Sequence, residues 1–178
     1  MSSSSEQIEV FLRFCVPYLL MFALFVFNIV SLSSVIITGS FEIPFFLGAI
    51  YYWSVYRPTL IPVWFVFISG FALDLITGLP VGISSFIFIL VRWVVTDQRL
   101  FLANQSFSSV WIGYVLVCIF TNSVRWVLFG LVEGHWVGIF PVLVVIVLGC
   151  CIYPFLSVAL YLSHRVLPHL SDHYSAVK

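Results

Sequence analysis

The chain has 178 residues, of which 62% are hydrophobic and only 8% are charged. A soluble domain carries about a quarter charged residues, so this chain has too few charges to cover a surface that faces water. Its net charge of zero also argues against electrostatic capture of nucleic acid as a main activity. A membrane helix needs about 20 apolar residues, so the length allows at most about six or seven spans and no soluble enzymatic domain beside them. The composition predicts an all-α polytopic membrane protein.

The chain begins MSSSSEQIEV, which lacks the basic region of a signal peptide, and the following apolar run from Cys15 to Ile37 is too long for one. We interpret that run as a retained first span. Turn residues and charges divide the apolar runs into six predicted transmembrane helices, at residues 15–38, 42–56, 59–77, 80–96, 106–130 and 136–163. The expected organisation is a short N-terminal tail (1–14), a six-helix transmembrane domain (15–163) and a C-terminal tail (164–178).

The distribution of basic residues predicts the orientation. If the N-terminus is cytoplasmic, five basic residues fall in cytoplasmic segments, namely Arg13, Arg57, Arg99, Arg165 and Lys178. Arg92 lies near the cytoplasmic end of the fourth span and can extend toward it. Residues 96–105, TDQRLFLANQ, form the most polar interior stretch and predict a cytoplasmic loop. Both termini are therefore expected in the cytoplasm.

Asp74 and Arg125 lie within apolar spans, about 6–8 Å from the outer boundary at 1.5 Å rise per residue. Because an isolated charge in lipid is unfavourable, we expect these two opposite charges to pair across the third and fifth spans. Gly70, Asp74 and Gly78 share one helix face, where glycines allow a neighbouring helix to approach closely. Cys118, Thr121, Asn122 and Arg125 form a comparable polar stripe. Both stripes are consistent with bundle packing or with a partner or ligand site.

The sequence contains no clear pattern for metal binding or for catalysis. The cysteines lack CxxC spacing, and the C-terminal histidines His164, His169 and His173 are irregularly spaced, so neither a metal nor a cofactor is expected. The pair Ser84-Ser85 has no plausible base, and no trio of nucleophile, base and orienting group can be assembled. We therefore expect no catalytic residue and no enzyme activity. The GxxxGxxxG run of Gly130, Gly134 and Gly138 matches a helix-dimer motif, but Glu133 and His135 interrupt it and favour loop glycines.

The segment from Phe41 to Ile83 reads FEIPFFLGAIYYWSVYRPTLIPVWFVFISGFALDLITGLPVGI. It resembles the rod shape-determining protein MreD family of bacteria. In that family a Pro-led span with an aromatic pair precedes a basic or Pro turn and a span ending in G-x-x-x-D-L-x-x-G-x-x-x-G. The matching positions here are Pro44, Tyr52, Trp53, Arg57, Pro58, Gly70, Asp74, Leu75, Gly78 and Gly82. The motif covers about a quarter of the chain, and the region after Gly82 carries no family motif that we can place.

The resemblance implies a fold similar to the substrate-binding subunits of energy-coupling-factor vitamin transporters. It also implies a non-enzymatic scaffold in the bacterial inner membrane, within the machinery that elongates the cell wall. The implied partners are the bitopic protein MreC and, directly or indirectly, the actin-like MreB and the RodA–penicillin-binding-protein synthase. The alternative is a small-molecule binding subunit of a transporter. That function needs several convergent polar groups, and Asp74, Asn122 and Arg125 are a thin set for it.

Overall fold

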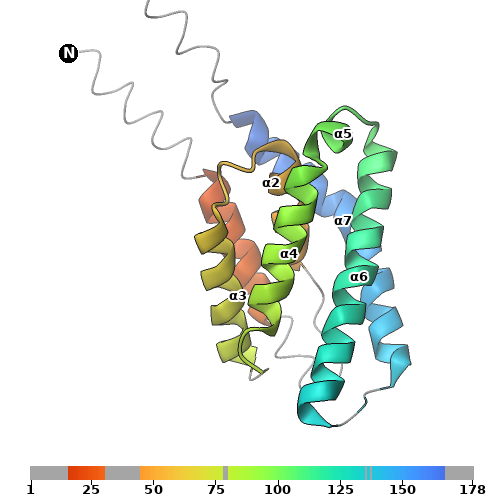
Figure 1. Ribbon diagram of the computed structural model, residues 1–178. Coiled ribbons are helices and arrows are strands. Elements are labelled where there is room, and N and C mark those ends of the chain that lie inside the picture. Colours follow the sequence, from red (N-terminus) through yellow and green to blue (C-terminus); the bar gives the residue numbers. More distant parts are fainter. Residues whose placement is uncertain (1–15, 31–44, 78–79, 135, 137, 167–178) are drawn as a thin grey trace, which may run out of the picture.

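The computed structural model describes residues 16–30, 45–77, 80–134, 136 and 138–166. This part of the chain is helical and contains no strand. Figure 1 shows the helices side by side in an elongated bundle. The N-terminal helix, Val16–Val30, begins at the end of the bundle where α5 (Arg99–Ala103) lies, and α7 (Ile139–Val166) finishes there. The turn after α2 lies at the same end. We call it the basic end, because Arg57, Arg92 and Arg99 lie there.

Helix α2 (Phe45–Tyr56) lies at the centre of the bundle. Every residue from Phe46 to Val55 is buried, and the helix packs against α4 (Ile83–Asp97), α5 and α7. A helix that is apolar on all sides is either enclosed by protein or faces lipid, and α2 is enclosed. It ends at Tyr56, as predicted, because Pro58 cannot continue the helical hydrogen-bond pattern. The turn is closed by a hydrogen bond from the Leu60 N–H to the Arg57 carbonyl at 3.1 Å.

The helices differ in length, and the shorter ones end inside the bundle. Within α6 (Phe107–Glu133) and α7, the stretches 107–132 and 139–163 are long and apolar enough to cross a membrane. By contrast, α2 has 12 residues, and α3 (Val63–Thr77) and α4 have 15 each. Figure 1 shows α6 reaching beyond α3 and α4 at the end opposite the basic end. The shorter helices therefore have termini inside the apolar bundle, where backbone groups need protein partners.

Two connections differ from or refine the expectations from sequence. The predicted loop at 96–105 is wrong in its middle, because Gln98 ends α4 and residues 99–103 then form the short helix α5. In the last turns of α6, a Cβ on Gly130 would lie 2.7 Å from the ring of Trp136, which belongs to the connection to α7. Gly134 follows the last residue of α6 and caps it. The expectation of loop glycines is therefore wrong for Gly130, which lies inside α6, and holds for Gly134 and Gly138, which lie between α6 and α7.

The backbones of α3 and α4 approach each other closely at Gly70. A Cβ built on Gly70 would lie 2.6 Å from the Ser85 Cα and 2.7 Å from the Ser85 nitrogen. Those atoms belong to the backbone and cannot rotate away, so any side chain at Gly70 must separate the two helices. The expected close approach at the Gly70 face is thus present, whereas Gly78 lies outside the described residues.

Gly70→Ala should destabilise the protein by about 1–3 kcal/mol, because added volume at a tight contact forces backbone shifts. Gly138→Ala is a matched control, since the nearest atom to its Cβ would be 4.0 Å away. Thermal unfolding in detergent should show a lower midpoint for the first variant and an unchanged midpoint for the second. Equal midpoints for both variants would contradict the close packing of α3 on α4.

Candidate functional site: a buried polar cluster at the start of α4

Asp74, on the last turns of α3, is fully buried and accepts hydrogen bonds from the beginning of α4. The Gly82 N–H donates to its Oδ2 at 2.8 Å. The Ser84 N–H lies 3.1 Å from Oδ2 and 3.2 Å from Oδ1. The carboxylate of one helix therefore caps the N-terminus of the next.

The local backbone explains why this cap comes from a distant residue. The first N–H groups of any helix lack partners within the helix. At α4 the N-cap position is Gly82, which has no side chain to offer and whose φ of 104° suits glycine. Asp74 supplies the missing acceptor, and its negative charge lies at the positive end of the α4 dipole. Gly70 makes this contact feasible by letting α3 lie directly on α4.

Arg125 reaches the same turn of α4 from α6. It is buried, and its Nη2 donates a hydrogen bond of 2.9 Å to the Ser84 Oγ. Ser84 thus binds Asp74 through its backbone and Arg125 through its side chain, and it links α3, α4 and α6. This arrangement brings the two predicted charges to one residue. The direct Asp74–Arg125 pair that the sequence suggests stays a prediction.

Two buried amides complete what we call the polar cluster, which consists of Asn28, Asp74, Ser84, Asn122 and Arg125. On α6, the Asn122 Nδ2 donates to the Cys118 carbonyl at 2.8 Å. On the N-terminal helix, the buried Asn28 accepts a hydrogen bond of 3.2 Å from the Phe46 N–H. Asn28 therefore contacts the first turn of α2 as Asp74 contacts that of α4. A small cavity of about 10 Å³ lies beside these residues.

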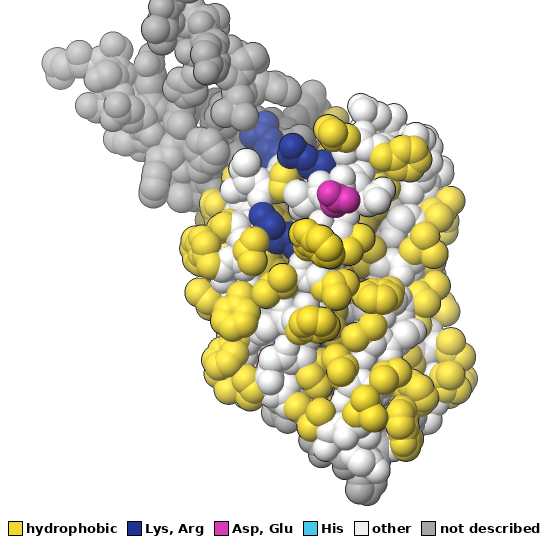
Figure 2. Space-filling model, viewed as in Figure 1, with side chains coloured by type: hydrophobic (Ala, Val, Ile, Leu, Met, Phe, Trp, Pro, Cys, Tyr) yellow, Lys and Arg dark blue, Asp and Glu magenta, His cyan; other side chains and the backbone are white. Residues whose placement is uncertain are grey.

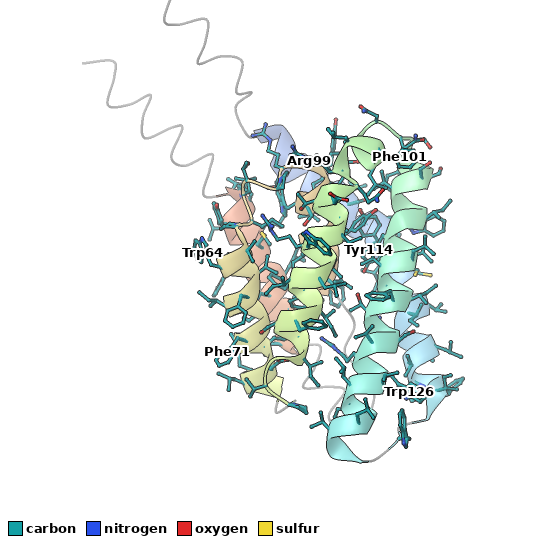
Figure 3. All side chains as sticks on the ribbon, in the orientation of Figure 1. Trp64, Phe71, Arg99, Phe101, Tyr114 and Trp126 are labelled. Atoms are coloured by element: carbon teal, nitrogen blue, oxygen red, sulfur yellow. The ribbon has the colours of Figure 1, made fainter. Side chains whose placement is uncertain are left out.

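Figure 3 places Arg99 and Phe101 at the basic end, with Phe71 and Trp126 toward the other. Asp74 follows Phe71 by one helical turn and Arg125 precedes Trp126, so the polar cluster lies away from the basic end. At the basic end, Arg92 extends to the turn between α2 and α3, as its position in the sequence suggested. Its Nε donates to the Ile61 carbonyl at 2.6 Å and its Nη2 to the Pro58 carbonyl at 3.4 Å.

The remaining motif residues are not brought into the polar cluster. Tyr52 and Trp53 are buried in α2, where their rings meet edge to face at 5.5 Å. Arg57 and Pro58 form the turn at the basic end, and Leu75 is exposed. Pro44 and Gly78 lie outside the described residues. The motif therefore marks two separate structural elements, namely the core helix α2 and the α3–α4 contact.

Reasoning from sequence missed two members of the cluster. The pair Ser84-Ser85 suggests a nucleophile at most, although the place of Ser84 just after a turn and at a helix start is typical of a residue that bonds backbone or cap groups. Asn28 gave a weaker signal, as one amide in a long apolar run. Within the described residues, no group of three or more His, Cys, Asp or Glu side chains could hold a metal ion.

None of the protein-family models, curated proteins or solved structures compared with the chain matches it.

Asp74→Asn should destabilise the protein by about 1–3 kcal/mol, because an amide offers one acceptor oxygen where two N–H groups converge. Asp97→Asn removes an exposed acid at the far end of α4 and is the matched control.

If Asp74 and Arg125 also act as a pair, the double variant Asp74→Asn with Arg125→Gln should be less destabilised than the sum of the two single variants. Thermal unfolding of the four proteins measures this coupling. Strict additivity would refute the pair but not the cap.

Proposed function

We propose that this chain is a non-enzymatic, multi-pass scaffold of the bacterial inner membrane, of the MreD type. In this role it binds the transmembrane helix of an MreC-type partner and positions the cell-wall elongation machinery, including MreB, RodA and its penicillin-binding protein. Rod shape then depends on it. Two features support this function. One is the motif from Pro44 to Gly82, and the other is that the buried polar side chains of the bundle mainly hold helices together.

One observation carries this proposal. The buried charged and amide groups of the polar cluster bind helix termini, backbone carbonyls and Ser84, so the bundle itself uses them. The cavity beside them is about 10 Å³, whereas a small-molecule site occupies roughly 300–1,000 Å³. A cluster that holds helices together in a space of this size favours a scaffold over a transporter subunit with its ligand at Asp74 and Arg125.

The surface is consistent with a chain that lies in lipid. Large apolar side chains are exposed along all the longer helices except the enclosed α2, and Phe155 at 80% and Phe140 at 74% are extreme cases. Figure 2 shows hydrophobic side chains over most of one face, with Lys and Arg side chains gathered toward one end. Exposed apolar area on this scale is incompatible with a monomer in water. Six spans with both termini cytoplasmic would place the basic end at the inner surface.

A second candidate function has an observation of its own. A groove between α2, α6 and α7 has a volume of about 290 Å³ and is lined by four tyrosines, Tyr52, Tyr56, Tyr153 and Tyr161. This size approaches that of a small-molecule site, and tyrosine combines an apolar ring with a hydrogen-bonding hydroxyl. Tyr56 ends α2 and Phe107 begins α6, so this groove lies toward the basic end, and a vitamin-like ligand bound here would be far from Asp74 and near the inner surface in the six-span arrangement.

Reporter fusions test the proposed topology. A reporter after Lys178 should report the cytoplasm, and one in the connection that follows Glu133 should report the opposite side, because the loop Lys and Arg residues then share one side. The same sidedness at both positions would refute the six-span arrangement.

Purification of the tagged chain at native expression level tests the function. We expect a bitopic membrane protein at near-stoichiometric yield, together with loss of rod shape when the chain is depleted. Native mass spectrometry should be run on the same material, and on Tyr161→Phe as a variant of the tyrosine groove. A bound vitamin-like molecule that Tyr161→Phe releases, or a copurifying ATPase module, would replace the scaffold by the transporter function.

A further inference from the structure

An open groove lies between α4, α5 and α6, apart from the polar cluster. Its volume is about 450 Å³, and its lining includes none of the five residues of that cluster. The buried Tyr51 of α2 contributes to the lining, but its hydroxyl already donates to the Val110 carbonyl at 2.9 Å. An occupant must therefore be recognised by apolar contact and by groups at the mouth of the groove.

The lining of the groove changes from polar to apolar with distance from the basic end. Gln98 ends α4 and Ser109 lies in the first turn of α6, so both lie at the mouth. Ile112 and Leu116 follow along α6, and Leu116 is about 10 Å deeper than Ser109 at 1.5 Å rise per residue. This order, polar at one end and apolar toward the middle of the bundle, is also the order of groups along a phospholipid.

The depth of the groove matches one leaflet of a bilayer. Its lining along α6 extends from Ser109 to Val117, which is about 12 Å, and half of the hydrocarbon core is about 15 Å thick. Helix α6 itself continues to Glu133. A transmembrane helix of a partner would cross both leaflets, whereas this groove ends within one. Its depth therefore favours a lipid tail over a spanning helix.

Two opposite charges flank the mouth of the groove. Asp97 and Arg99 are the neighbours of Gln98 in the chain, and both are exposed. Figure 3 places Arg99 at the basic end, and Figure 2 shows an acidic side chain near the basic ones there. A guanidinium binds phosphate oxygens well, and a carboxylate accepts hydrogen bonds from an ammonium group. One charge of each sign suits a headgroup that contains both a phosphate and an ammonium group.

Helix α5 supports a position at the membrane surface. None of its five residues is buried, and Leu100 and Phe101 are 73% and 65% exposed. Phe101 also lines the groove. A short segment that combines an arginine with exposed apolar side chains is typical of the boundary between headgroups and acyl chains.

We propose that this groove binds a zwitterionic phospholipid of the leaflet at the basic end. One acyl chain lies along Ile112 and Leu116, the phosphate binds Arg99 and the ammonium group binds Asp97. The site requires that the chain lies in a membrane, but it does not depend on the MreD-type function and would serve a scaffold or a transporter subunit equally.

Native mass spectrometry of the full-length chain tests the site. The protein is purified in detergent and given equal amounts of phosphatidylethanolamine and phosphatidylglycerol with the same acyl chains. We expect one phosphatidylethanolamine to be retained in preference. Arg99→Gln should lower its retained fraction about two- to fivefold, the range expected for an exposed ion pair. Leu116→Trp should lower it at least as much by filling the deep part of the groove, and Asp97→Asn should shift the preference toward phosphatidylglycerol.

Matched controls separate the groove from the rest of the surface. Arg57→Gln removes a basic residue at the same end but from the α2–α3 turn, and Ile119→Trp adds an indole to an exposed position of α6 outside the groove. Neither should change the retained fraction. Unchanged retention in both Arg99→Gln and Leu116→Trp, or a preference of the unaltered chain for phosphatidylglycerol, would overturn the proposal.

A photoreactive residue at Ile112 provides a second measurement, made in the cell membrane. We expect cross-links to phospholipid, and the same residue at Ile119 should give no preference for phosphatidylethanolamine. Cross-linking of position 112 to the transmembrane helix of another protein would overturn the proposal, because the groove would then be a protein interface.

Discussion

A helix that begins inside an apolar bundle leaves its first N–H groups without water, and this constraint governs the polar residues of the protein. Helices α2 and α4 are short, and the side chain of a preceding helix satisfies the start of each one. Asn28 accepts the Phe46 N–H, and Asp74 accepts the N–H groups of Gly82 and Ser84. The carboxylate in the middle of an apolar segment is thus explained by the backbone that it caps.

Hydrogen bonds between side chains and backbone groups fix α4 to its neighbours near both of its ends. Asp74 binds its first turn, and near its last turns Arg92 reaches the carbonyls of Ile61 and Pro58 in the α2–α3 turn. The carboxylate lies at the positive end of the helix dipole and the guanidinium toward the negative end, so both charges are favourably placed. The tight contact at Gly70 joins α3 to α4 between these two points. Arg125 then connects this pair to α6 through Ser84.

Periodicity and turn chemistry in the sequence predicted the end of α2 at Tyr56, the small-residue face of α3 and the burial of Asp74 and Arg125. They could not identify what Asp74 binds, because its partners are backbone N–H groups and the sequence of residues 82–84 does not show that these groups are buried. The role of Asn28 could not be predicted for the same reason, because its partner is the backbone N–H of Phe46. The loop predicted at 96–105 failed in its middle because a single helical turn, α5, gives no periodic signal. Patterns of side chains therefore located the buried charges, while their partners required the fold.

The geometry also determines how the effects of substitutions should be interpreted. In a ligand-binding subunit, polar side chains converge on a cavity, and replacing one weakens binding while the fold persists. Here Asp74, Arg125 and Asn28 contact helix termini or Ser84, so replacing any of them should first loosen the contacts between helices. The tyrosine-lined groove of α2, α6 and α7 contains none of these three residues. A loss of binding in an Asp74 variant would therefore report on how the helices pack, and only changes at an open groove could separate recognition from folding.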